Sequence, residues 1–247
     1  MQFEGKVVII TGAGKGIGRA AALAFANEGA QVVCNSMTDS GRAVAESIGN
    51  RRASLFVQGD VSDEKVSARI VAETIRKFGK IDILFNNAGI VIPGTLDQTT
   101  VRDWDRVMSV NVRSVFLMSM HSFPHLAKSK GVIINNASSV ALKGVGERFA
   151  YTASKGAILS MTRSMAVDCL KHGIRVNCIC PGTTDTPSLA ERIMYGENPE
   201  RLREELKIRQ PMGRFGTPEE IAEGVLYLAG ATFCTGIHLS VDGGMTT

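Results

Sequence analysis

The 247-residue chain lacks any apolar run long enough to cross a membrane. The first strand-like run, KVVIIT, begins at Lys6, and too few residues precede it to form a signal or transit peptide. We therefore expect a cytoplasmic protein with no membrane partner.

The sequence also lacks a cluster of basic residues. The 28 lysines and arginines are scattered along the chain, and the formal net charge is only +4. A protein that follows a nucleic-acid backbone needs a clustered basic stripe. We expect no nucleic-acid partner, although the small positive excess suits an anionic cofactor or substrate.

Metal and disulfide patterns are equally sparse. The five cysteines are odd in number and do not have the spacing of a disulfide framework. Cys178 and Cys180 share one strand-like run, and His121 and His125 share one helical stretch, but neither pair has an evident third ligand. We therefore expect no metal site.

Several motifs that would assign other functions are absent. No Gly-Lys pair is followed by Ser or Thr, as a Walker loop requires, and no G-x-S-x-G marks a hydrolase. No linker rich in Pro, Gly and Ser and no internal repeat divides the chain. Residues 1–247 are therefore expected to form a single domain.

What is present is an alternation of two patterns. Short β-branched runs, mostly apolar throughout, occur at 6–11, 30–35, 53–58, 80–86, 131–137, 173–179 and 236–242. Stretches with helical period lie between them, near 16–28, 39–49, 62–78, 102–129, 152–171 and 217–229. Such strands are covered on both faces, so the sequence predicts an α/β fold with a doubly wound, mostly parallel seven-stranded sheet flanked by helices.

One long stretch, from Pro181 to Thr217, contains no strand pattern. It includes the charged helical piece ERLREELKIR. Long excursions in a tight α/β chain are often lids, so residues near 183–215 are expected to form a substrate loop or lid. The alternative is a surface-packed helix pair or a subunit contact.

The loop TGAGKGIG, residues 11–18, follows the first strand and opens a helix. Its glycines allow a tight turn that brings the backbone close to a pyrophosphate at the helix N-terminus. The expected cofactor contacts in this loop are Gly12, Gly14, Lys15, Gly16, Ile17 and Gly18. The alternative is a plain strand-to-helix turn.

The ends of the next two strands bear on the adenosine part of the cofactor. An acid at the end of the second strand would favour NAD, but Ser36 stands there, and Lys15 can attract a 2′-phosphate. The sequence thus favours NADP(H) over NAD(H), unless Asp39 reaches the ribose. Asp60 and Val61 end the third strand near the expected adenine site, although Asp60 can instead help Ser62 or Asp63 to cap the following helix.

A series of spaced motifs resembles the short-chain dehydrogenase/reductase family in its single-domain form. The glycine loop, NNAG at 86–89, Asn111 in MSVNV, Ser138, YTASK at 151–155 and Pro181-Gly182 occur in the family's order. The resemblance spans Lys6 to Met245. It implies a Rossmann-type fold, a nicotinamide cofactor and a homotetramer in which the helices at 102–129 and 152–171 pair between subunits.

The chemistry of hydride transfer explains the catalytic residue types that the resemblance implies. Tyr151 is the expected general acid/base, but a phenol has a reference pKa of about 10, too high for a base at neutral pH. Lys155 lies one helical turn away, and its ammonium group favours the phenolate. Ser138 is expected to hold the substrate oxygen, with Ser139 as its rival. The resemblance gives Asn111 a water in a proton relay, while an ordinary buried hydrogen bond is the alternative.

The resemblance also implies further cofactor contacts, each with a structural alternative. Lys155 is expected to hydrogen-bond the nicotinamide ribose, and the fourth strand and the segment after Pro181 supply the rest: Asn87, Ala88, Gly89, Pro181, Gly182, Thr184 and Thr186. Asn87 can instead tie neighbouring strands together. Thr184 and Thr186 can instead serve turn chemistry.

The expected function is hydride transfer between NADP(H) and a small-molecule ketone or aldehyde, reversible as a secondary-alcohol dehydrogenase. The alternatives are a 3-oxoacyl-carrier-protein reductase, with Arg102, Arg106 and Arg113 as a docking patch, and an NAD-dependent sugar or polyol dehydrogenase. A non-catalytic nucleotide-binding protein is the remote alternative. Candidates for shaping the substrate pocket are Lys143, Glu147, Arg148, Met194 and Tyr195.

Overall fold

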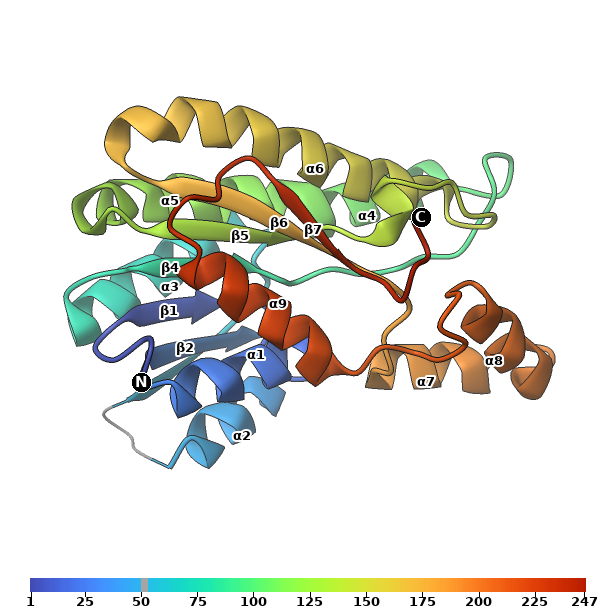
Figure 1. Cartoon of the computed structure of the whole chain (residues 1–247), viewed down its shortest axis with the longest axis horizontal. Helices are drawn as coiled ribbons and strands as arrows, with labels where there is room; N and C mark the ends of the chain where they lie inside the picture. The colour runs from blue at the N-terminus through green and yellow to red at the C-terminus, as the bar shows by residue number, and fades with distance from the viewer. Residues whose placement is uncertain (50–52) are drawn as a thin grey trace.

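A computed structural model describes residues 1–49 and 53–247 (Figure 1). Seven strands form one sheet in the order β3-β2-β1-β4-β5-β6-β7, and every neighbouring pair is parallel. The strands are β1 (Val7–Ile10), β2 (Gln31–Ser36), β3 (Ser54–Gln58), β4 (Ile83–Asn86), β5 (Val132–Asn136), β6 (Arg175–Pro181) and β7 (His238–Val241). All seven predicted strands are present, and the predicted doubly wound fold is confirmed.

Helices cover both faces of this sheet. The α-helices of the described residues are α1 (Gly16–Asn27), α2 (Ser40–Ser47), α3 (Glu64–Phe78), α4 (Val101–Met108), α5 (Ser114–Ser129), α6 (Phe149–Cys169), α7 (Pro187–Met194), α8 (Pro199–Ile208) and α9 (Pro218–Gly230). Figure 1 shows α1, α2 and α9 on one face and α5 and α6 on the other. In the described residues, no helix is both long enough and apolar enough to span a membrane.

The continuous apolar runs are explained by this double covering. Side chains alternate along a strand, so Val8 and Ile10 pack with α1 and α9, while Ile9 packs on the opposite face with α3, α5 and α6. The strand order reverses between β1 and β4, which opens a crevice at the carboxyl ends where ligands bind in such sheets.

Two predicted helical regions differ in detail from the structure. The helix predicted over 102–129 is α4 and α5 joined by a π-helical turn, Ser109–Arg113. The stretch after Pro181 forms α7 and α8, which lie beyond the carboxyl ends of the strands (Figure 1). Leu189 and Ile193 of α7 pack there against Leu206 of α8 and Phe215, forming a small apolar cluster of their own.

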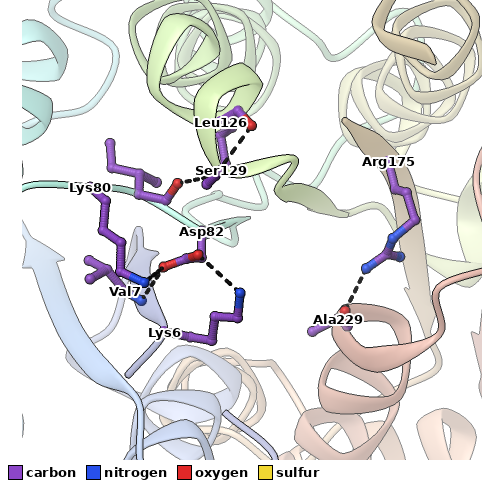
Figure 2. A network of polar contacts seen from close by, with 9 residues as sticks. Lys6, Val7, Lys80, Asp82, Leu126, Ser129, Arg175 and Ala229 are labelled. Carbon is purple, nitrogen blue, oxygen red and sulfur yellow. Dashed lines mark hydrogen bonds and ion pairs between the residues drawn. The ribbon is translucent and has the colours of Figure 1, made fainter. Parts of the chain in front are cut away.

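The opposite end of the sheet is held by a buried carboxylate (Figure 2). Asp82 is 4% exposed and accepts a hydrogen bond of 2.9 Å from the backbone N–H of Val7. Its oxygens also lie 3.2 Å from Lys6 Nζ and 3.0 Å from Lys80 Nζ. This carboxylate therefore satisfies the first backbone donor of β1 and draws two cations to the start of β4.

Removing this carboxylate is expected to destabilise the fold. Asp82→Ala leaves the Val7 N–H buried without a partner, which should lower the free energy of unfolding by about 2 kcal/mol in a urea titration. Lys80→Ala is the control, because the Lys80 side chain is half exposed and should contribute less than about 1 kcal/mol. Equal losses in the two variants would contradict this assignment.

Candidate active site

The glycine loop forms a cradle between β1 and α1. Gly12 and Gly16 have φ values of +65° and +51°, a region that residues with a Cβ rarely adopt. A Cβ at Gly18 would collide with the Gly12 carbonyl oxygen, and one at Gly14 would collide with the side chain of Ser40. Lys15 precedes α1 and gives it no side-chain cap, so the first amides of the helix keep their donors for a ligand. These features fit the pyrophosphate of a dinucleotide.

The end of β2 carries no free carboxylate. The Ser36 hydroxyl donates to Thr38 O at 2.5 Å and accepts from the Gly41 N–H at 3.0 Å, so it closes the loop that leads into α2. Asp39 forms an ion pair with Arg42 at 3.2 Å. The exposed Lys15 stands in the adjacent glycine loop, whose Gly14 lies against the start of α2.

Asp60 at the end of β3 is held by local partners. Its Oδ1 accepts from the Ser62 N–H and hydroxyl at 2.9 and 2.7 Å, and its Oδ2 lies 3.3 Å from Arg106. Partial burial raises the pKa of this carboxyl, but these hydrogen bonds and the Arg106 charge outweigh burial and lower it overall. Asp63 caps α3, as the structural alternative foresaw, and Val61 beside Asp60 is buried.

The carboxyl ends of β1, β4 and β5 are tied together by side-chain hydrogen bonds. Thr11 Oγ1 accepts from the N–H groups of Asn87 and Ala88 at 2.9 and 3.0 Å. The Asn87 amide donates to Thr11 O and Gly12 O, and its Oδ1 accepts from Asn136 Nδ2 at 2.9 Å. Asn87 therefore ties neighbouring strands together, which was the alternative to a cofactor contact, and its amide also holds the start of the glycine loop.

Ser138, Tyr151 and Lys155 converge on one cavity of about 180 Å³ at the carboxyl ends of β5 and β6. Ser138 follows β5 in extended conformation, while Tyr151 and Lys155 lie one turn apart on α6. The buried Lys155 Nζ lies 5.6 Å from the Tyr151 ring centroid and donates to Asn136 O at 2.6 Å. Sequence spacing alone could not establish this meeting of two elements.

The predicted segment after β6 borders the same cavity. Pro181, Gly182, Thr184 and Thr186 all line it, together with Ile17 of the glycine loop. Thr186 also caps α7 by accepting from the Leu189 N–H at 3.3 Å, so its turn role is present as well. The glycine cradle and the three convergent side chains thus border a continuous region.

Burial controls the protonation of the two catalytic candidates. Burial raises the pKa of Tyr151, and a hydrogen bond with Ser138 and the charges of Arg192 and Arg148 only partly oppose that rise. Burial lowers the pKa of Lys155 to about 8, opposed by Cys180 and Cys178. At neutral pH and without ligands, the phenol is therefore protonated and Lys155 is charged.

Asn111 lies in the π-helical turn, a feature that often marks functional sites. Its Oδ1 accepts from the Ile90 N–H at 2.8 Å, and its Nδ2 donates to Ile90 O and to Ser154 Oγ at 3.0 and 2.9 Å. Ser154 in turn donates to Tyr151 O at 2.7 Å. A Cβ on Gly89 would lie 3.3 Å from Asn111 Oδ1 and 3.6 Å from Lys155 Nζ, so these two polar groups flank one small gap.

Ser154 is a site residue that sequence reasoning missed, although it stands inside YTASK. Its position three residues after Tyr151 is the usual spacing for a serine that bonds back to its own helix. Its full burial and its hydrogen bond from Asn111 distinguish it from an ordinary helical serine. Neither property can be read from the sequence.

The pocket candidates from the sequence are only partly supported. Arg148 lines the cavity, whereas Lys143, Glu147, Met194 and Tyr195 do not and are exposed. Two arginines that the sequence did not single out, Arg192 and Arg209, line the cavity instead. They lie in the excursion after Pro181, where only the packing of α7 on α8 decides which side chains face inward. Within residues 1–49 and 53–247 no group of three potential ligands could hold a metal ion.

The low pKa of Lys155 predicts a pH-dependent stability. Between pH 8 and 10.5 the folded protein binds fewer protons at Lys155 than the unfolded chain, so stability rises with pH across that window. Relative to Lys155→Met, the wild type should gain about 1 kcal/mol of unfolding free energy between pH 7 and pH 9 in urea titrations. The half-exposed Lys80 gives the control variant Lys80→Met. If the difference in unfolding free energy between the wild type and Lys155→Met stays constant or falls as the pH rises, the burial of a charged lysine is contradicted.

Comparisons with known proteins agree with this geometry. The family model described as enoyl-(acyl carrier protein) reductase matches residues 12–246. An uncharacterised oxidoreductase of Thermotoga maritima is 44% identical over 100% of this chain and 99% of its own length. The L-fucose dehydrogenase of Mus musculus is 39% identical, covering 98% of this chain and 89% of that protein. The crystal structure of levodione reductase aligns with a TM-score of 0.93 at 33% identity, covering 99% of this chain and 98% of the other. The chain belongs to the short-chain dehydrogenase/reductase family and is an oxidoreductase.

Proposed function

We propose that the chain uses NADP(H) to interconvert a ketone or aldehyde with the corresponding alcohol, with Tyr151 as general acid/base. The observation that carries the proposal is the convergence of Ser138, Tyr151 and Lys155 on one cavity beside the glycine cradle. Residues 1–247 act in this proposal as one dinucleotide-binding and catalytic domain.

Each of the three side chains has a defined task. A bound nicotinamide cofactor supplies the hydride for reduction or accepts it for oxidation. The Ser138 hydroxyl donates to the substrate oxygen and holds it against the Tyr151 phenol. Tyr151 delivers the proton to that oxygen during reduction, and the Lys155 ammonium stabilises the phenolate that remains.

Asn111 is proposed to support the return of the proton to this site. It flanks the gap beside Gly89 together with Lys155 Nζ, and its hydrogen bonds to Ile90 and Ser154 hold the amide in one orientation. Asn111 therefore orients polar atoms next to the lysine without itself changing protonation.

The cofactor contacts are proposed on the same geometry. We assign the pyrophosphate to the glycine cradle, the adenine to Asp60 and Val61, and the nicotinamide to the segment from Pro181 to Thr186 and to Lys155. NADP(H) is favoured because Asp39 is paired with Arg42 and no carboxylate at the end of β2 repels a phosphate, while Lys15 is exposed nearby.

The alternatives are weaker on specific grounds. A 3-oxoacyl-carrier-protein reductase needs a basic docking patch, but Arg106 is paired with Asp60 and Arg102 with Asp103. A neutral sugar or polyol has no group that would neutralise the arginines of the cavity. A protein that only binds nucleotides would have no use for a buried lysine beside a tyrosine and a serine.

We further propose a homotetramer and a lid. Exposed apolar side chains on the two long helices, Phe116 and Met120 on α5 and Val167 on α6, suit pairing between subunits. The proposed lid is the α7–α8 segment, because it borders the cavity and keeps its own small apolar cluster.

The proposed chemistry is tested with Tyr151→Phe. The variant removes only the hydroxyl, so kcat for reduction of a carbonyl panel should fall by about 10² or more while cofactor affinity changes less than about twofold. Tyr195→Phe is the control, because Tyr195 is 82% exposed and lies outside the cavity. A Tyr151→Phe enzyme that keeps wild-type kcat would rule out the phenol as the proton donor.

The cofactor preference is tested by fluorescence titration with NADPH and with NADH. The wild type should bind NADPH more tightly, and Lys15→Ala should weaken NADPH about tenfold and leave NADH nearly unchanged. Arg19→Ala is the matched control, one turn further along α1 and also exposed. If NADH binds more tightly and Lys15→Ala alters neither affinity, the cofactor is NAD(H).

A further inference from the structure

The cavity that holds Tyr151 has an unusual balance of charge. Three arginines, Arg148, Arg192 and Arg209, line it together with Lys155. No aspartate or glutamate is among its lining residues. None of the three guanidinium groups forms an ion pair with a carboxylate in the described part of the chain. Arg148 and Arg192 repel each other, and the neighbouring Glu147 carboxylate only partly offsets the lowering of the pKa of Arg148 by burial and by the Arg209 charge.

Arg148 is built into the body of the domain. It directly precedes α6 and is 7% exposed, and its guanidinium donates to Glu147 O at 2.6 Å. Glu147 itself has φ of +57°, a left-handed conformation that is costly for a residue with a Cβ. Hydrogen bonds of 3.1 Å from the Gly94 N–H to Glu147 O and from the Phe149 N–H to Gly94 O clamp this turn. Glu147 is exposed and Arg148 is buried, and the strained turn between them fixes where the cation enters the domain.

Arg192 and Arg209 come from the α7–α8 segment. Arg192 lies on α7, and Arg209 directly follows α8. Arg192 Nε is buried and has no hydrogen-bond partner among the described residues. A buried donor on a cation is costly to leave unpaired, so a ligand acceptor is expected opposite it. Burial, and then repulsion from Arg148, lower the pKa of Arg192 to about 10, so it remains charged at neutral pH.

We propose that this cavity selects a substrate bearing a carboxylate, a short-chain oxo acid or hydroxy acid, and that Arg148, Arg192 and Arg209 hold its carboxylate while Ser138 and Tyr151 hold its carbonyl or hydroxyl oxygen. Guanidinium groups bind carboxylate oxygens through paired, charge-assisted hydrogen bonds. The inference rests on the proposed function, because the carbonyl is the group that reacts at Tyr151.

Size and position limit the ligand further. The cavity of about 180 Å³ corresponds to roughly six water molecules in volume, and the proposed nicotinamide site shares its lining from Pro181 to Thr186, so the acid has only a few carbons. Arg148, Arg192 and Arg209 line the same cavity as Tyr151, which places them at the reacting end of the site, and the charges of Arg192 and Arg148 lower the pKa of Tyr151. They are therefore separate from the glycine cradle and from Lys15, where the cofactor phosphates are assigned.

The carboxylate also joins two parts of the chain. One arginine belongs to the body that carries Tyr151, and two belong to the α7–α8 segment, so a bound carboxylate bridges them. Without an anion the like charges oppose close approach of the segment to the body. Binding of the acid therefore favours the closed arrangement of the proposed lid.

The first experiment compares acids with their neutral esters. Pyruvate, acetoacetate and levulinate carry the ketone at increasing distance from the carboxylate, and each has a methyl ester with the same carbonyl. With either nicotinamide cofactor, at least one acid should exceed its ester in kcat/KM by tenfold or more. Arg192→Gln should remove most of this advantage by raising the KM of the acid, and should lower kcat/KM for the acid by a clearly larger factor than for the ester. Arg201→Gln, on an exposed α8 arginine, is the control.

Two outcomes of that experiment would overturn the inference. In one, every acid and its ester react equally well in the wild type. In the other, Arg192→Gln slows acid and ester by the same factor, which indicates a structural role.

A binding measurement separates this inference from the proposed function. Sodium butyrate should raise the Tm of the wild type above that in equal sodium chloride, and should not do so for Arg192→Gln. Stabilisation by inorganic phosphate but not by butyrate would overturn the assignment of a carboxylate. If the protein reduces neutral ketones but butyrate does not raise its Tm, the carboxylate site is contradicted and the proposed oxidoreductase chemistry is retained. A butyrate effect with no carbonyl reduced would support the anion site and remove the proposed reaction.

Discussion

A ladder of buried asparagines links the sheet to the helix that carries the catalytic candidates. Asn86 on β4 donates to Asn135 Oδ1 on β5 at 2.9 Å, and Asn135 donates to Thr162 Oγ1 on α6 at 2.9 Å. These side chains are buried, where a satisfied polar contact specifies one arrangement, and within the described residues Asn86 Oδ1 has no hydrogen-bond partner. The ladder fixes how α6 sits on β5, and this determines where Tyr151 and Lys155 meet Ser138.

Lys155 shows how the fold sets the chemistry of the site. Its ammonium is buried and donates to the Asn136 carbonyl at the end of β5 at 2.6 Å. Burial lowers the pKa of Lys155 and raises that of Tyr151, because it penalises the charged form of each group. A phenolate formed beside the ammonium is stabilised by it, since the low dielectric that penalises each lone charge strengthens their attraction.

The cavity combines strain and unpaired charge in the same region. The left-handed Glu147 turn, the unpartnered Arg192 Nε and the three facing guanidinium groups each cost free energy in the unliganded protein. Strain and unpaired charge of this kind are typical of ligand sites, because a bound ligand can relieve them. The glycine cradle, by contrast, is built from residues that adopt positive φ without steric strain, which suits backbone contacts to a cofactor.

The sequence by itself determined the seven strands, their burial on both faces of a mostly parallel sheet and the presence of the glycine loop. These features rest on local patterns, because apolar runs and glycines act over a few residues. Motif order was enough to indicate the family and to nominate Ser138, Tyr151 and Lys155. Only the tertiary structure showed that α6 carries the last two to the end of β5, that a π-helical turn sets Asn111, and that Ser36 closes its own loop. The inward direction of Arg192 and Arg209 depends on how α7 packs against α8 across residues far apart in sequence, and no local pattern encodes that contact.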